Sequence, residues 1–283
     1  MPNHSLATTE KGSQTIFLNS DDAEFSISDA EKFFYLNQSI IAPPGYRLLM
    51  GLNNLTIPNT MYNINSTNNT ITIDSTLFTL PVGNYSGTSL ATALNGLSGF
   101  SHLGTMTFNS DNNLFSLNSG STSRTIQDSI LASKVMGFTG LPKDSVIIPT
   151  GGVDINFILG TNTCNLAGVT NIYVRVRNLS FNNLDSRGQI TNVIANVVNN
   201  TNFGGFVFYQ PPEVLYYLLN ENIINHLDIE LTDQEGNVLE LNGASFNLTF
   251  TIHYTHQRQS LIKNSLLDEI REKNKTKEEK KSS

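Results

Sequence analysis

Apolar and polar residues alternate in short runs along most of this chain, which is the pattern of half-buried β-strands. The clearest run contains Ile172, Val174 and Val176, whose apolar side chains share one face of the predicted strand, whereas Arg175 and Arg177 share the other. Further strands are expected at 33–41, 46–57, 70–74, 104–109, 113–118, 192–199, 205–209, 227–231 and 246–254. The chain is therefore expected to be mainly β.

Turn-forming residues separate these strands at short intervals. The Pro-Pro-Gly run at 43–45 interrupts two strand patterns, because prolines lack the backbone donors that a sheet needs. The run Asp-Gln-Glu-Gly-Asn at 233–237 predicts another compact turn. Many short strands at a spacing of ~8 to 12 residues indicate a sandwich rather than alternating β-α-β units. We therefore expect a single jelly-roll β-sandwich.

The pattern changes between residues 59 and 145, where strand signals are mixed with two helical ones. A first short helix is expected near Leu90 and Leu94, capped by Thr88 or Ser89 and ended by Gly96. A second short helix is expected over 129–136. We interpret the whole stretch as a small α+β insertion between early strands of the sandwich.

Composition changes also divide the chain into parts. Residues 1–24 are polar apart from Ile16, Phe17 and Leu18, and we expect an N-terminal arm that orders only against a partner. The other expected parts are a jelly-roll domain over 25–58 and 146–256, an inserted module over 59–145 and a charged C-terminal tail over 257–283.

Composition and charge exclude several classes of protein. The 283 residues are 39% hydrophobic, enough for a substantial core, and the net charge is −7 without a basic stripe in the body of the chain, so a specific nucleic-acid site is not expected. Cys164 is the single cysteine, which rules out an intrachain disulfide and fits a reducing compartment. The polar N-terminus does not read as a signal peptide, so we expect the protein to start in the cytosol.

Candidate chemistry is sparse. The single cysteine excludes the usual structural zinc sets, and His253 and His256 are three residues apart in a strand, which sends them to opposite faces. No Gly-x-Ser-x-Gly element or other nucleophile arrangement occurs. We therefore expect neither an enzyme nor a cofactor or metal site.

Several sequence elements, taken in order, resemble a known group of viral proteins. They are the segment 45–65, the run Leu-Pro-Val-Gly-Asn-Tyr-Ser at 80–86, Met-Gly-Phe at 136–138, Asn-Leu-Asp-Ser-Arg-Gly at 183–188, and Ile-Glu-Leu-Thr-Asp-Gln-Glu-Gly-Asn at 229–237 followed by 241–243 and 246–252. This order resembles penton and minor capsid proteins of polinton-like viruses, virophages and related large double-stranded DNA viruses. Phe246 stands where Trp is expected in many relatives.

The resemblance implies a structural capsid protein of the virion, assembled in the host cytoplasm or nucleus. It implies a penton subunit that forms homo-pentamers at the five-fold vertices and contacts trimers of a double jelly-roll major capsid protein, with other minor capsid proteins as further partners. Two alternatives stay open: a minor capsid or cement subunit away from the vertices, and a lectin-like attachment head in which Tyr62, Tyr85 and Asn-rich loops contact sugars. The sequence assigns no membrane partner to the tails.

The sequence pattern and the family resemblance together suggest residues for an interface between subunits. Arg175 and Arg177 share the polar face of a strand, where they either pair with acidic residues of a neighbouring subunit or face solvent. The loop that contains Asp185 and Arg187 resembles one in the family, but Gln189 replaces the carboxylate of an Arg-Gly-Asp attachment motif, which favours a tight turn. The apolar residues of the expected arm, Ile16, Phe17 and Leu18, complete the set.

Overall fold

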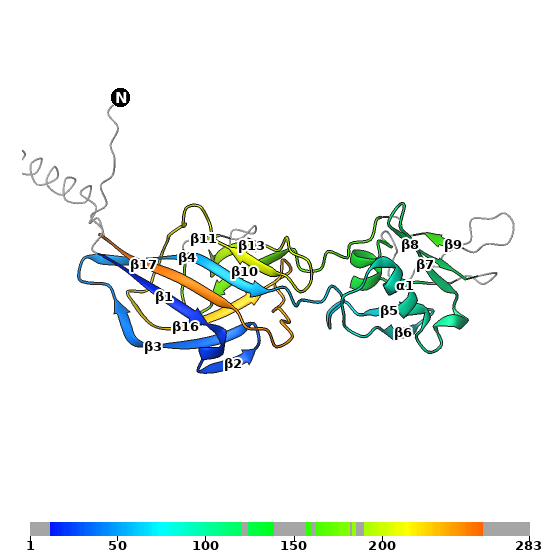
Figure 1. Cartoon of the computed structure of the whole chain (residues 1–283), viewed down its shortest axis with the longest axis horizontal. Coiled ribbons are helices and arrows are strands. Elements are labelled where there is room, and N and C mark those ends of the chain that lie inside the picture. Colours follow the sequence, from blue (N-terminus) through cyan, green and yellow to red (C-terminus); the bar gives the residue numbers. More distant parts are fainter. Residues whose placement is uncertain are drawn as a thin grey trace, which may run out of the picture.

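The computed structural model describes residues 12–119, 124–138, 157–159, 162–181, 183–184 and 190–256. Figure 1 shows an elongated molecule with two lobes, a larger β-sandwich and a smaller lobe that contains α1 and β5–β9.

The first sheet of the sandwich has the strand order β1-β17-β4-β14, with β15 also beside β4. Its strands are β1 (Ser13–Asn19), β4 (Tyr46–Pro58), β14 (Phe206–Tyr209), β15 (Tyr217–Leu218) and β17 (Asn247–His256). All of their pairings are antiparallel.

The second sheet has the order β13-β10-β16-β3-β2 and is also antiparallel. Its strands are β2 (Phe25–Ser28), β3 (Glu31–Ile41), β10 (Asn171–Val176), β13 (Val193–Val198) and β16 (Ile223–Thr232). A separate two-stranded pair joins β11 (Asn183–Leu184) to β12 (Ile190–Thr191).

The pairing of these strands is nested. When β2, β15 and the β11–β12 pair are set aside, eight strands in the described part of the sandwich pair first with last (β1–β17), second with seventh (β3–β16), third with sixth (β4–β14) and fourth with fifth (β10–β13). A long antiparallel hairpin rolled into two facing sheets produces this order, which is the jelly roll. The predicted mainly β, single jelly-roll fold with an α+β insertion between early strands is confirmed.

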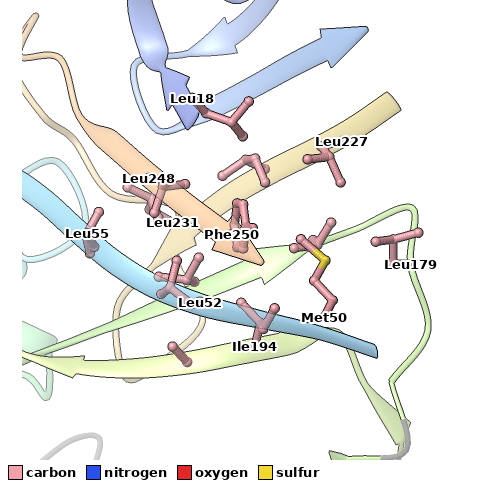
Figure 2. Close-up of a cluster of buried hydrophobic side chains, with 14 of the residues drawn as sticks. Leu18, Met50, Leu52, Leu55, Leu179, Ile194, Leu227, Leu231, Leu248 and Phe250 are labelled. Carbon is pink, nitrogen blue, oxygen red and sulfur yellow. The ribbon is translucent and has the colours of Figure 1, made fainter. Parts of the chain in front are cut away.

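The core of the roll lies between the two sheets. Figure 2 shows Met50 and Phe250 of the first sheet pointing toward Ile194 and Leu231 of the second. The predicted apolar face of β10 is also confirmed, because its residues 172, 174 and 176 are all fully buried.

The N-terminal residues differ from the sequence expectation of an arm. Ser13–Asn19 form β1, which pairs with β17 along seven residue pairs and buries Leu18. The 3-10 helix η1 (Ser20–Asp22) follows, and Ser20 exchanges hydrogen bonds with Phe246. These residues order against a strand of the same chain, since β17 would otherwise leave an open edge and uncovered apolar side chains.

The smaller lobe combines two short sheets with three short helices in its described part. Its elements are β5 (Thr70–Ile73), β6 (Thr76–Thr79), α1 (Gly87–Asn95), η2 (Phe100–His102), β7 (Thr105–Asn109), β8 (Leu114–Asn118), the π-helical turn η3 (Ile130–Val135) and β9 (Phe157–Leu159). Their apolar side chains form a second cluster, separate from the core of the roll. The lobe therefore has its own core.

Both predicted helices lie close to their expected positions, but the N-cap residue of the first helix was predicted incorrectly. Ser86, rather than Thr88 or Ser89, caps α1, and Ser89 completes a capping box by accepting from the Ser86 backbone N–H at 2.8 Å. The second helix, expected over 129–136, is η3, and Ser129 caps it by accepting from the Ala132 N–H at 3.1 Å.

The boundary expected at residue 145 also differs. β9 (Phe157–Leu159) pairs with β8 in the smaller lobe, and Cys164 and Leu166 pack against its core. The chain therefore returns to the roll only after Leu166. The strand β9 was not predicted because three apolar residues carry no period that separates a strand from a loop.

Two matched leucine substitutions test the assigned core. Leu248→Ala, a fully buried change on β17, should lower the free energy of unfolding by about 2–5 kcal/mol because it leaves a cavity. Leu77→Ala, on the exposed face of β6, should change it by no more than about 0.5 kcal/mol. Chemical denaturation followed by circular dichroism measures both. Equal effects of the two substitutions would contradict the assigned core.

Candidate interface surfaces

A cluster of charged residues occupies the outer face of the second sheet. Arg175 of β10 lies opposite Glu230 of β16, and Glu230 lies opposite Glu31 of β3. Directly opposed residues of an antiparallel sheet point to the same side, so the pairing brings these charges together on the face away from the core.

Arg177 is the centre of this cluster. Its guanidinium donates to Glu31 at 2.8 Å, to Asp228 at 3.0 Å and to Glu230 at 3.2 Å. The hydrogen bond to Asp228 is the main cause of a raised pKa for Arg177, opposed by desolvation and assisted by the three carboxylate charges. A raised pKa on a cation adds stability that is fully present at neutral pH and is lost only as the pH rises through the raised value.

Arg175 is also satisfied within the chain. Its side chain donates to Thr232 at 3.1 Å and to Asn192 at 3.2 Å, and its Nε lies 3.8 Å from the Glu230 carboxylate. The acidic partners of both arginines therefore come from β3 and β16 of the same chain. A role for Arg175 and Arg177 between subunits stays a prediction.

The three apolar residues predicted at the N-terminus point to different sides. Ile16 and Leu18 face the core of the roll, whereas Phe17 points outward and is 77% exposed. Only Phe17 of this group is available to a partner. Asp185 and Arg187, the remaining candidates, lie outside the described residues, between β11 and β12 in the sequence.

The outer face of the first sheet exposes large apolar side chains. We call this surface face 1; its exposed residues are Phe17 on β1, Phe206 and Phe208 on β14, and Leu215. Leu215 lies over this face because the chain crosses β4 at Gly51, where an added Cβ would come within 2.9 Å of Val214, Leu215 and Tyr216. Gly51 is therefore required for the close approach of this segment.

The outer face of the second sheet carries an aromatic group beside the charged cluster. We call this surface face 2; it comprises Phe25, Phe33, Tyr35 and His226 together with the cluster around Arg177. The Phe33 ring stacks on His226 and meets Tyr35 edge-on, each at a centroid distance of 4.8 Å. Phe25 pairs with Phe33 across β2 and β3 and is 61% exposed.

Face 1 and face 2 point away from each other, because they are the outer sides of two sheets packed over one core. They differ in composition, since face 1 combines isolated apolar side chains with Thr and Asn, whereas face 2 combines an aromatic group with ion pairs. A contiguous exposed apolar group, such as the aromatic group of face 2, marks a surface that contacts other proteins, whereas isolated apolar side chains are common on any protein surface. The pattern Phe-Val-Phe at 206–208 predicted a strand, but which of its faces is covered depends on residues far away in the sequence.

The described residues offer little for catalysis. Within them, no three His, Cys, Asp or Glu side chains come together in a way that could hold a metal ion. Burial raises the pKa of the Cys164 thiol, which disfavours the nucleophilic thiolate. No helix in the described part is long and apolar enough to cross a membrane.

The structure thus defines a jelly-roll protein with an inserted α+β lobe and two distinct exposed faces. The sequence matches no protein-family model and no curated protein. Among solved structures, the chain is similar to the mavirus penton protein, with 11% identity over 85% of this chain and 100% of that chain and a TM-score of 0.46. The nested strand pairing of this chain itself defines the jelly roll.

Substitution of Arg177 tests whether the charged cluster stabilises the roll. Arg177→Met should lower the free energy of unfolding by about 1–2 kcal/mol, because three neighbouring carboxylates lose their counter-ion. The loss should shrink in molar salt, which screens the carboxylates from one another. Denaturation curves with and without salt measure both effects.

Lys134→Met is the matched control. Its ion pair with Glu235, the one it forms with a described residue, is 3.9 Å long and exposed, so the change should stay within about 0.5 kcal/mol. An Arg177→Met protein as stable as the wild type would show that the cluster does not hold the sheet together.

Proposed function

We propose that this chain is a structural capsid protein, a penton subunit that forms pentamers at the five-fold vertices of an icosahedral virion. The observation that carries the proposal is the pair of different, exposed faces on opposite sides of one jelly roll. The order of sequence motifs shared with penton and minor capsid proteins supports the same conclusion. Jelly rolls serve many functions, so the fold alone does not decide it.

The two faces suit a head-to-tail contact. A two-fold dimer buries the same patch of both subunits, whereas a ring buries one patch of each subunit against a different patch of the next. Face 1 and face 2 are such a pair, because both expose aromatic side chains but, among the described residues, they differ in composition. The number of subunits in the ring, five, is what the resemblance of the sequence motifs to penton proteins implies.

The ends of the roll support an orientation in the particle. β17 ends beside the start of β4, at Tyr46 and His256, whereas the smaller lobe follows the opposite end of β4 at Pro58 (Figure 1). In this proposal, the end near His256 meets neighbouring double jelly-roll trimers and other minor capsid proteins. The smaller lobe projects outward from the vertex.

Native mass tests the ring. We expect mass photometry of the full chain to show a species of about five times the 31.1 kDa chain mass that grows with concentration. Phe206→Ser with Phe208→Ser on face 1 should abolish it, and so should Phe25→Ser with Tyr35→Ser on face 2, because each pair removes exposed apolar side chains from one partner surface.

Mixing the two double variants sharpens this test. Each retains one intact face, so a head-to-tail contact predicts a 1:1 heterodimer in the mixture but no ring. Leu77→Ser, equally exposed on β6 of the smaller lobe, is the control and should leave the ring intact. A wild-type trimer, a monomer at all concentrations, or a ring that survives both double variants would contradict the proposal.

A further inference from the structure

A polar cavity lies between the smaller lobe and the roll. It is located where the two chain segments that connect the lobes meet the roll. Its volume is about 270 Å³, just below the ~300 to 1,000 Å³ of pockets for drug-sized ligands. Residues from four segments line it, including Asn59 after β4, Tyr85 before α1, Val169 on the return connection and Asn202 between β13 and β14.

Some of its polar side chains hold the cavity in shape. Asn63 donates to the backbone oxygens of Tyr85 and Leu166, at 2.8 and 3.0 Å, and accepts from the Tyr85 N–H. Asn199 donates to the Val169 carbonyl at 2.9 Å. These bonds tie together the segments that form the walls, so the cavity does not depend on a ligand for its shape.

Other amides in the lining are free. Within the described part of the chain, the side chains of Asn84 and Asn202 make no hydrogen bond, and both residues are exposed to solvent. Asn59 donates to the Thr201 carbonyl at 2.8 Å, but its buried Oδ1 has no partner among the described atoms. An amide offers both a donor and an acceptor, the combination that pairs with a hydroxyl group.

An aromatic pair borders the same cavity. Phe203 lines the cavity and stacks on Tyr62 with a centroid distance of 5.5 Å and an interplanar angle of 21°. Phe203 is 45% exposed, which leaves ring surface open to a ligand. An aromatic ring beside polar groups suits a molecule with an apolar C–H face and a rim of hydroxyls.

Among the described residues, none that lines the cavity is charged. Lys and Arg are the side chains that pair with a phosphate or a nucleotide, and Asp and Glu are common ligands of a metal ion. The neighbouring hollow of about 120 Å³ contrasts with it, because Lys134, Asp233 and Glu235 line that one. The polar cavity is therefore matched to an uncharged ligand.

From this geometry we infer that the cavity between the lobes binds a neutral saccharide, with one or two sugar rings seated between Asn84, Asn202 and the exposed face of Phe203. The site lies beside the end of β14 that faces the smaller lobe, because Asn59 in its lining follows Pro58, the residue that pairs with Phe206.

Saturation-transfer difference NMR on the full chain tests the site. The probes are glucose, galactose, mannose and N-acetylglucosamine at millimolar concentration, and glucose 6-phosphate is the charged counterpart. At least one neutral sugar should receive saturation, and glucose 6-phosphate should receive less than glucose. Asn84→Ala and Asn202→Ala should each weaken the binding by about five-fold, because each removes a hydrogen-bonding partner.

The control is Asn220→Ala, another exposed asparagine without a side-chain hydrogen bond among the described residues, which should bind as the wild type does. Circular dichroism and native mass of each variant show that the fold and the ring are unchanged. No saturation of any neutral sugar, a stronger signal from glucose 6-phosphate, or binding unaffected by both substitutions would overturn the inference. None of these results bears on ring formation.

Discussion

The pairing of the first strand with the last is the interaction on which the rest of this structure depends. β1 and β17 are more than two hundred residues apart, yet they match along seven residue pairs, from Ser13 with His253 to Asn19 with Asn247. Without β1, the backbone donors and acceptors of β17 would face solvent, and Leu248 and Phe250 would lose the cover of Leu18. Two hydrogen bonds between Ser20 and Phe246, each 2.9 Å long, fix the end of this pairing. The other nested pairs then lie inside a closed roll.

Closure of the roll explains what sequence patterns could and could not predict. The alternation around Val174 depends on neighbours within six residues, so the strand and its two faces were predicted. The run Ile16-Phe17-Leu18 is short and flanked by polar residues, and its partner is at the other end of the chain. Nothing local distinguishes it from an apolar island in an arm. Local patterns thus identify strands, but a pairing at long range decides which short runs become strands.

The candidate surfaces also depend on pairings between strands that are far apart in the sequence. Sequence placed Arg175 and Arg177 on a polar face correctly, but Glu31 and Asp228, which satisfy Arg177, come from two other strands. Whether an arginine is free for a neighbour cannot be read from its own strand. The exposure of Phe206 and Phe208 has the same origin, since the pairing of β14 with β4 turns Val207 into the core and leaves these two side chains on the outer face of the sheet.

The roll and the smaller lobe have separate hydrophobic cores, so the two lobes can serve different functions. The roll packs around Phe250 and Met50, and the smaller lobe packs around Phe100 and Phe115. Among the described residues, the groups that join the lobes include Lys134 of η3, whose Nζ lies 3.9 Å from the Glu235 carboxylate of the roll. Side chains on the smaller lobe can therefore change without disturbing the packing that shapes face 1 and face 2. The cavity at the junction differs in this respect, because residues of both lobes build its walls. Its shape, like that of the neighbouring hollow lined by Lys134, Asp233 and Glu235, depends on how the smaller lobe is held against the roll. A ligand in this cavity would therefore contact both the lobe suited to assembly and the lobe free to vary.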